Sequence, residues 1–388
     1  MAELGHGRGR NSTIAYSFRQ RAWPLSRAAA SGSRAPHGLL APRRRFGFNE
    51  RTRMPPLVSV VIPTYKSGAW VAETLASVVS QTYPADRLEI IVTDDVSPDD
   101  SVAVARKFLD GHRLNSRVVV REKNGGAAAN RNSGYRLASG DWIQFLDADD
   151  LLAPHKIELQ ARVAADAPDD VAVVYSNWQY YQLEGGKWQP VGPLNAPVVD
   201  DDPVLRMLQD LAFGYVGPTL IRRAFLERVG GFDERPNLGE DSDLMLRIAM
   251  AGGRFREARS ETAAFLYRQW PESLWRSHIK NVTAMRNLMG TYRRAEAFLR
   301  EQSPNGLSEA ARVALAGRYS RFADLYLEND PETFRELMGW LAELGFDRPT
   351  GLTPRLRMLS NAIGYENAVR LRSAFRKQVQ RFRQNAKP

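Results

Sequence analysis

The chain has 388 residues, of which 43% are hydrophobic and 25% charged, and it contains no cysteine. This composition excludes a chain that is disordered throughout, and the length suffices for two domains of ordinary size. Without cysteine, a disulfide scaffold, a Cys-ligated metal site and a thiol nucleophile are all excluded. No apolar run reaches the roughly 18 residues of a membrane-spanning helix. We therefore expect a cytoplasmic protein that is soluble or peripheral to a membrane.

The net charge of +10 is concentrated at the two ends of the chain. Residues 1–53 contain 11 Arg and 2 Glu, and residues 355–388 contain 9 basic residues and 1 Glu. The remainder has 34 basic and 41 acidic residues. A body with this acidic balance has no reason to bind a phosphate backbone, so no nucleic-acid partner is expected.

Residues 1–53 are rich in Arg, Ser, Gly and Ala and show no sustained hydrophobic period, which predicts a disordered basic extension. The composition is also typical of an organellar transit peptide, whereas the apolar core of a secretory signal is missing. Met54 stands directly before Pro55 and the first predicted strand. We therefore favour an upstream extension or a misplaced start over a transit peptide.

From Leu57 onward, short apolar runs alternate with segments of helical period, which is typical of parallel strands joined by helices. Strands are predicted at residues 58–62, 88–93, 117–121, 142–146 and 171–176. The pattern indicates an α/β protein with a doubly wound, mostly parallel sheet. Such sheets bind ligands outside the carboxyl ends of their strands, where this chain carries acidic clusters.

Beyond residue 176 the alternation is lost. An aromatic stretch from Trp178 to Trp188 contains a predicted turn at Gly185 and Gly186, and its rings either stack on a sugar or pack into the core. Helices are predicted at residues 203–211 and 241–250 and, after Trp275, nearly to the end, with a break at 349–354. We expect four parts: a basic extension (1–53), an α/β domain (54–275), a helical C-terminal region (276–354) and a basic amphipathic tail (355–388).

Two acidic clusters follow predicted strands. Asp94 and Asp95 stand where a carboxylate can accept hydrogen bonds from a nucleobase or ribose, while the nearby Ser97 and Asp99 can instead cap the next helix. The second cluster is Asp147-Ala148-Asp149-Asp150. Three carboxylates are costly to hold together without a cation, and Mg²⁺ or Mn²⁺ takes one or two carboxylates plus diphosphate oxygens. The alternative is that Asp149 or Asp150 caps the helix near Pro154.

Two further segments are candidates for the same site. Glu240 and Asp241 begin a predicted helix, whose dipole keeps a carboxylate ionised and able to act as a general base, although first-turn acids also stabilise a helix by themselves. Small residues between Asn124 and Asn132 allow a ligand to approach the backbone, and Arg131 can meet a phosphate. The alternative for that segment is a tightly packed helix.

Taken in chain order, these segments resemble the family 2 glycosyltransferases, which share the nucleotide-sugar-binding A fold. The resemblance covers about residues 57–275. Residues 58–65 resemble the opening strand, and Asp94 to Ser97 the nucleotide-base turn, with Val96 where glycine is usual. Residues 124–132 and 140–150 resemble the stretch that leads into the metal motif. The acceptor side is matched by residues 230–234 and by Glu240-Asp241.

The resemblance implies a metal-dependent inverting glycosyltransferase with a helical C-terminal extension. It assigns Asp95 to the uracil-like base of a UDP-sugar, flanked by the backbone from Pro63 to Tyr65, and it assigns Asp147 to ribose and metal. The remaining implied roles are Asp149 as a ligand of Mn²⁺ or Mg²⁺ and Asp241 as the base that deprotonates the acceptor hydroxyl. Trp270 stands where many members carry His, which implies a looser metal site.

The expected role is the assembly of a glycan, a surface polysaccharide or a glycolipid on a carbohydrate or lipid-linked acceptor. A nucleotidyltransferase is the rival enzyme, but residues 63–68 poorly match its Gly-rich loop. A non-catalytic sugar-nucleotide-binding scaffold is the other alternative, and the presence of Asp241 argues against it. In the tail, Val369, Leu371 and Phe375 recur at near-helical spacing among basic residues. This helix either lies on the inner face of an anionic membrane or packs against the acidic body.

Overall fold

The structure is a computed structural model that describes residues 54–198, 202–210, 215–235, 239–269, 281–321 and 323–385. The predicted disorder of residues 1–53 and the role expected for Trp270 lie outside the described residues.

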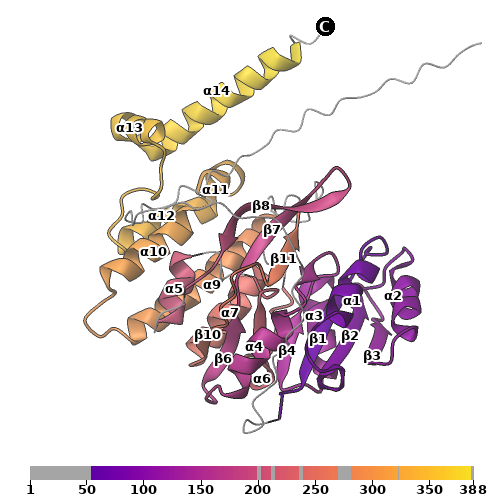
Figure 1. The fold of residues 1–388 in the computed structure, drawn as a ribbon. Helices are drawn as coiled ribbons and strands as arrows, with labels where there is room; N and C mark the ends of the chain where they lie inside the picture. Colours follow the sequence, from indigo (N-terminus) through magenta and orange to yellow (C-terminus); the bar gives the residue numbers. More distant parts are fainter. Residues whose placement is uncertain are drawn as a thin grey trace, which may run out of the picture. The chain divides into compact units, whose positions relative to one another are not determined.

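A seven-stranded sheet with the strand order β10-β6-β9-β4-β1-β2-β3 forms the centre of the α/β part (Figure 1). Its strands are β1 (Val58–Thr64), β2 (Leu88–Asp94), β3 (Asn115–Val120), β4 (Trp142–Phe145), β6 (Val171–Tyr175), β9 (Thr219–Arg222) and β10 (Arg254–Glu257). β4, β1, β2 and β3 are parallel to one another, β10 is parallel to β6, and β9 runs antiparallel between β4 and β6. The predicted doubly wound, mostly parallel sheet is confirmed.

The central strand β1 shows why the sheet is covered on both faces. Val60 and Ile62 belong to one core cluster, whereas Val61 between them belongs to a second cluster, as the alternation of side chains along a strand requires. All three side chains are fully buried. A nearly continuous β-branched run is what a strand buried on two faces needs.

Helices occupy both sides of this sheet. The cluster of Val60 includes residues of α1 (Val71–Val79), α2 (Ser101–Asp110) and α4 (Lys156–Ala165). The cluster of Val61 includes residues of α3 (Gly126–Leu137), α5 (Pro203–Gln209), α6 (Arg223–Val229) and α7 (Glu240–Met250). A short 3₁₀ helix, η1 (Ala85–Arg87), precedes β2. The predicted helices at 203–211 and 241–250 are confirmed by α5 and α7.

A second, four-stranded sheet has the order β5-β11-β7-β8. It consists of β5 (Leu151–Leu152), β11 (Phe265–Arg268), β7 (Trp178–Glu184) and β8 (Lys187–Asn195). The predicted turn is confirmed, since β7 and β8 form a hairpin and both Gly185 and Gly186 have positive φ angles, 56° and 77°. Trp178 is buried and its ring packs edge-on against Tyr180 and Tyr215, so this part of the aromatic stretch belongs to the core.

The C-terminal region is helical, as predicted. Its helices are α9 (Val282–Glu301), α10 (Glu309–Ser320), α11 (Ala323–Asn329), α12 (Pro331–Glu343), α13 (Pro354–Ile363) and α14 (Tyr365–Asn385). The predicted break falls between α12 and α13, where the Thr353 hydroxyl caps the new helix. Leu288, Tyr319 and Val369 belong to the same core cluster as Val61. Among the described residues, no helix is long and apolar enough to cross a membrane.

Candidate active site

The candidate residues gather at the carboxyl ends of the central parallel strands. Thr64 ends β1, Asp94 ends β2 in register with it, and Asp147 follows β4 on the other side of β1. Because these strands run in the same direction, their ends bring together residues that are 30 to 83 positions apart in the chain. This edge is where doubly wound sheets bind ligands.

The turn after β2 is held by its own carboxylates. Asp94 accepts hydrogen bonds from the backbone N–H of Ser97 (2.8 Å) and from its hydroxyl (2.5 Å), so Ser97 does not cap α2. Asp99 accepts the backbone N–H of Ser101, the first residue of α2, but the N-cap residue of this helix is Asp100 and no N-cap side chain caps it, so the predicted cap by Ser97 or Asp99 is not found. Val96, where the family resemblance expects glycine, has a positive φ of 62° and is exposed. The turn therefore has the left-handed backbone that favours glycine.

The Asp95 carboxylate is buried and fully engaged within the protein. It accepts the backbone N–H groups of Gly125 (3.0 Å) and Gly126 (2.8 Å), and it forms an ion pair with Arg121. The Asp95 backbone N–H donates to the carbonyl of Thr64 (2.9 Å), which places it beside the end of β1. Asp95 thus ties the turn after β2 to the start of α3, and its role in base recognition stays a prediction. Nearby, Pro63 is half-buried and Tyr65 is exposed.

Arg131 connects the strand-end aspartate to the start of α7. Its guanidinium lies 2.7 Å from a carboxylate oxygen of Asp147, 3.2 Å from one of Glu240 and 3.6 Å from one of Asp241. The Arg131 side chain is buried, and it comes from α3. Three residues predicted separately, Arg131, Asp147 and Asp241, therefore form one ion-pair cluster. In this state the guanidinium is engaged by carboxylates, and its contact with a phosphate stays a prediction.

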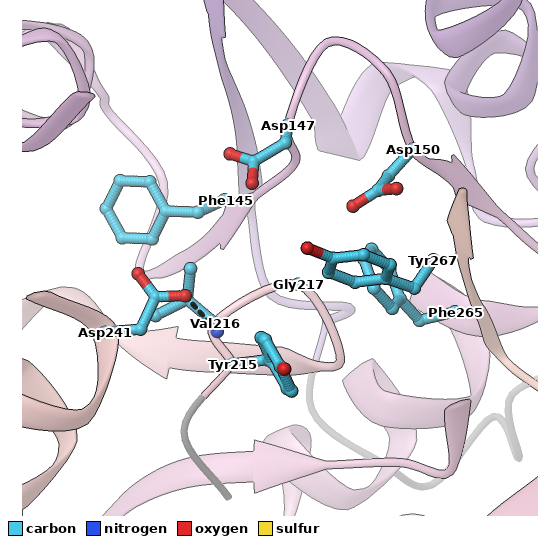
Figure 2. Close-up of a pocket in the computed structure, with 9 residues that line it drawn as sticks. All are labelled: Phe145, Asp147, Asp150, Tyr215, Val216, Gly217, Asp241, Phe265 and Tyr267. Carbon is cyan, nitrogen blue, oxygen red and sulfur yellow. Dashed lines mark hydrogen bonds between the residues drawn. The ribbon is translucent and has the colours of Figure 1, made fainter. Parts of the chain in front are cut away.

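Asp241 is half-buried in the first turn of α7 and lines a pocket. One carboxylate oxygen accepts the backbone N–H of Val216 (3.1 Å), and the other has no hydrogen-bond partner among the described residues (Figure 2). Burial, together with the charges of Glu240 and Asp147, raises the pKa of Asp241 to about 7, against the opposing effect of Arg131. A carboxylate with a pKa near the working pH is a more effective general base than an ordinary one.

Figure 2 shows the carboxylates of Asp147 and Asp241 and the hydroxyl of Tyr267 facing a common space. The pocket is lined by Phe145, Asp147, Asp150, Tyr215, Val216, Gly217, Asp241, Phe265 and Tyr267. It therefore combines acidic groups with aromatic rings.

The loop after β4 carries the candidate metal ligands. Burial and the charge of Asp147 raise the pKa of Asp149 to about 6, and burial with the charges of Asp149 and Asp147 raises the pKa of Asp150. No three His, Asp or Glu residues in the described ranges are arranged to hold a metal ion by themselves. A site of two carboxylates completed by diphosphate oxygens fits this loop, because Mg²⁺ is usually held that way.

Asp150 has a different role from the cap considered in the sequence. α4 begins at Lys156 with His155 as its N-cap residue, and no side chain caps it. The prediction that Asp149 or Asp150 caps this helix is therefore wrong. Instead, Asp150 accepts the backbone N–H of Arg268 at 2.7 Å. The cause is the antiparallel pairing of β5 with β11, which brings residue 268 beside the loop.

Sequence reasoning did not single out Val216, Tyr215 or Tyr267 as site residues. The Val216 amide carries no signal, because every residue except proline has this donor. The sequence indicates Tyr267 only weakly: it stands at the end of a short apolar run, as the predicted site residues do.

The sheet, its helices on both faces and the acidic pocket at the strand ends define a glycosyltransferase with the A-type fold. Residues 59–230 match the family model described as "Glycosyl transferase family 2". The resemblance noted in the sequence is thus confirmed for these residues, which make up somewhat less than half of the chain.

Curated relatives support the same family. The glycosyltransferase AglE of Haloferax volcanii is 29% identical over 200 residues, which cover 51% of this chain and 62% of AglE. The succinoglycan biosynthesis protein ExoO of Rhizobium meliloti is 26% identical over 262 residues, which cover 66% of this chain and 71% of ExoO. The match therefore covers less than two thirds of the length of AglE and slightly more than two thirds of the length of ExoO.

Among solved structures, residues 1–349 of TarS from S. aureus, in complex with UDP-GlcNAc, superpose with a TM-score of 0.56. The sequence identity is 20%, and the match covers 83% of this chain and 92% of that one. At this identity the likeness shows the fold.

Proposed function

We propose that the protein transfers a sugar from a nucleoside-diphosphate sugar to an acceptor hydroxyl, with inversion at the anomeric carbon. The observation that carries this proposal is the cluster in which the buried Arg131 joins Asp147 to the half-buried Asp241 beside one pocket. It pairs a strand-end carboxylate suited to the donor with a carboxylate suited to proton transfer. The family 2 domain makes a nucleotidyltransferase or a non-catalytic scaffold the less favoured alternative.

Asp241 acts as the general base in this proposal. It takes the proton of the acceptor hydroxyl while that oxygen attacks the anomeric carbon from the face opposite the diphosphate. The Val216 N–H orients the carboxylate, which leaves the second oxygen free to receive the proton. Arg131 lies 3.6 Å away and stabilises the ionised form.

The donor binds at the ends of β1, β2 and β4 in this proposal. Asp95 and the backbone from Pro63 to Tyr65 contact the base, and Asp147 and Asp149 hold Mn²⁺ or Mg²⁺. That ion, when bound, supplies positive charge against the leaving diphosphate. A UDP-sugar is the proposed donor, an assignment supported by the UDP-GlcNAc bound to TarS. The name of ExoO supports polysaccharide assembly as the process.

A panel of nucleotide sugars, each mixed with Mn²⁺ and a set of glycan and lipid-linked acceptors, tests the proposal by mass spectrometry. The expected product is the acceptor plus one sugar, with nucleoside diphosphate released. Asp241→Asn is the matched control, because it keeps the shape of the side chain and removes the base. Release of pyrophosphate would indicate nucleotidyl transfer, and binding without turnover by any donor would indicate a scaffold.

We also propose that the tail contacts the inner face of an anionic membrane, which suits a lipid-linked acceptor. Val369 of α14 is buried in the core, but Leu371 and Phe375 are 54% and 67% exposed. The sequence around them is rich in arginine, and each cation near an anionic surface contributes about 1 kcal/mol. Leu371→Ser combined with Phe375→Ser should reduce co-sedimentation with phosphatidylserine vesicles. Equal pelleting of both proteins would contradict membrane contact through this face.

A further inference from the structure

We infer that Thr74 and Arg268 are positioning residues that hold the loop 147–150 in the shape needed to bind a divalent cation. The inference rests on the proposed function, since that loop carries the proposed metal ligands. Neither residue was predicted from the sequence, and neither comes from the strand that leads into the loop. Thr74 belongs to α1 and Arg268 ends β11.

Arg268 contacts the loop through both its backbone and its side chain. The backbone N–H donates to the carboxylate of Asp150 at 2.7 Å, and the guanidinium Nε donates to the carbonyl of Asp149. The far end of the guanidinium forms an ion pair with Glu73 of α1 and lies near the ring of Trp188. The Arg268 side chain has 0% of its surface exposed.

Thr74 completes the contact from the other side. Its hydroxyl lies 2.8 Å from the carbonyl oxygen of Ala148 and 3.0 Å from that of Asp150. The same hydroxyl accepts a hydrogen bond from the Arg268 guanidinium at 3.3 Å. The single hydroxyl proton of Thr74 is shared between the carbonyl groups of residues 148 and 150, and Arg268 donates to that of residue 149, so two buried side chains contact three successive carbonyl groups.

These contacts fix the direction of the carboxylates. Buried carbonyl groups require hydrogen-bond donors, and a loop whose carbonyls are all held has little freedom to turn its side chains. The guanidinium also places a positive charge beside Asp149 and Asp150, which repel each other. Because Arg268 is fully buried, it acts on a ligand through the loop and not by direct contact. Outer-shell partners of metal ligands typically contribute 10- to 100-fold to metal affinity.

A matched pair of substitutions at Thr74 tests the inference in the full-length chain. Thr74→Val keeps the shape and removes the hydroxyl, whereas Thr74→Ser keeps the hydroxyl. Mn²⁺ is titrated by electron paramagnetic resonance in the presence of UDP, and uridine binding is measured without metal. We expect Thr74→Val to weaken Mn²⁺ binding about 10-fold, as loss of an outer-shell partner does. Thr74→Ser should bind Mn²⁺ like the wild type, and both should bind uridine like the wild type.

A second variant keeps the test informative if Thr74→Val does not fold. Glu73→Gln removes the ionic partner of Arg268 at a half-exposed position and should weaken Mn²⁺ binding in the same direction. Asp86→Asn, at a well-exposed carboxylate in η1, is its control. Wild-type Mn²⁺ affinity in both Thr74→Val and Glu73→Gln would overturn the positioning role alone. A wild-type protein that binds UDP but no Mn²⁺ would overturn the proposed metal site and this inference together.

Discussion

The raised pKa of Asp241 predicts a pH profile that an ordinary carboxylate would not give. With a pKa of about 7, about one tenth of Asp241 is ionised at pH 6 and about nine tenths at pH 8. If Asp241 is the base, kcat/KM should rise about tenfold over this range. A carboxylate with the usual pKa near 4 is ionised at both pH values and predicts a flat profile.

Glu240→Gln should move this profile to lower pH. The substitution removes a like charge that raises the pKa of Asp241, and it releases Arg131, which lies 3.2 Å from Glu240 and lowers that pKa. Both effects act in the same direction, so the largest gain relative to wild type should appear near pH 6. Asp241→Asn should lose the acid limb altogether and about 10²- to 10⁴-fold of the rate.

The assay is the initial rate of nucleoside diphosphate release at low donor concentration. Under this condition kcat/KM reports the pKa of the free enzyme, the state that the structure describes. Asp169→Asn, at a fully exposed carboxylate, is the control and should leave the profile unchanged. A wild-type profile that is flat between pH 6 and 8, or an upward shift in Glu240→Gln, would refute the assignment of Asp241.

Two further predictions concern the donor site. Asp149→Ala should abolish the metal dependence of nucleotide binding, whereas Asp95→Ala should weaken nucleoside binding with or without metal. Calorimetry on both variants separates the two roles. If both variants lose only the metal-dependent part of binding, the assigned roles are wrong. Val96→Gly should stabilise the fold by about 1 kcal/mol in urea unfolding, because valine at a φ of 62° is strained and glycine is not. Unchanged or lower stability would mean that the turn is not strained at Val96.

Most of the strands that the sequence predicted correctly are segments whose own side chains favour a buried β-strand. β1, β2, β3, β4 and β6 were located to within two residues at each end, and all of them except β3 are buried at nearly every position. β9 and β11 were missed. Each has only four residues, and β9 is a strand because it fills the space between β4 and β6. Pairing of that kind depends on residues far away in the chain, which local patterns do not record.

The site shows the same difference between features set by the local sequence and features set by distant residues. The positions of Asp95 and Asp147 at strand ends followed from the alternation of strands and helices. The partners of these carboxylates did not, because Asp95 is held by the backbone of Gly125 and Gly126 and Asp147 by Arg131. Arg131 also reaches Glu240, 109 residues further along the chain. Such pairs arise only when α3 and α7 pack around the same strand ends.

The charge balance of the site connects these features. Among the described residues it combines five carboxylates, those of Asp147, Asp149, Asp150, Glu240 and Asp241, with the guanidinium groups of Arg131 and Arg268. Burial, and after it the repulsion between neighbouring carboxylates, raises the pKa values of Asp149, Asp150 and Asp241. Arg131 cannot fully offset the repulsion between the carboxylates, because its one positive charge is shared by Asp147, Glu240 and Asp241. The same repulsion supports both proposals, that Arg268 positions the loop and that the loop binds a divalent cation.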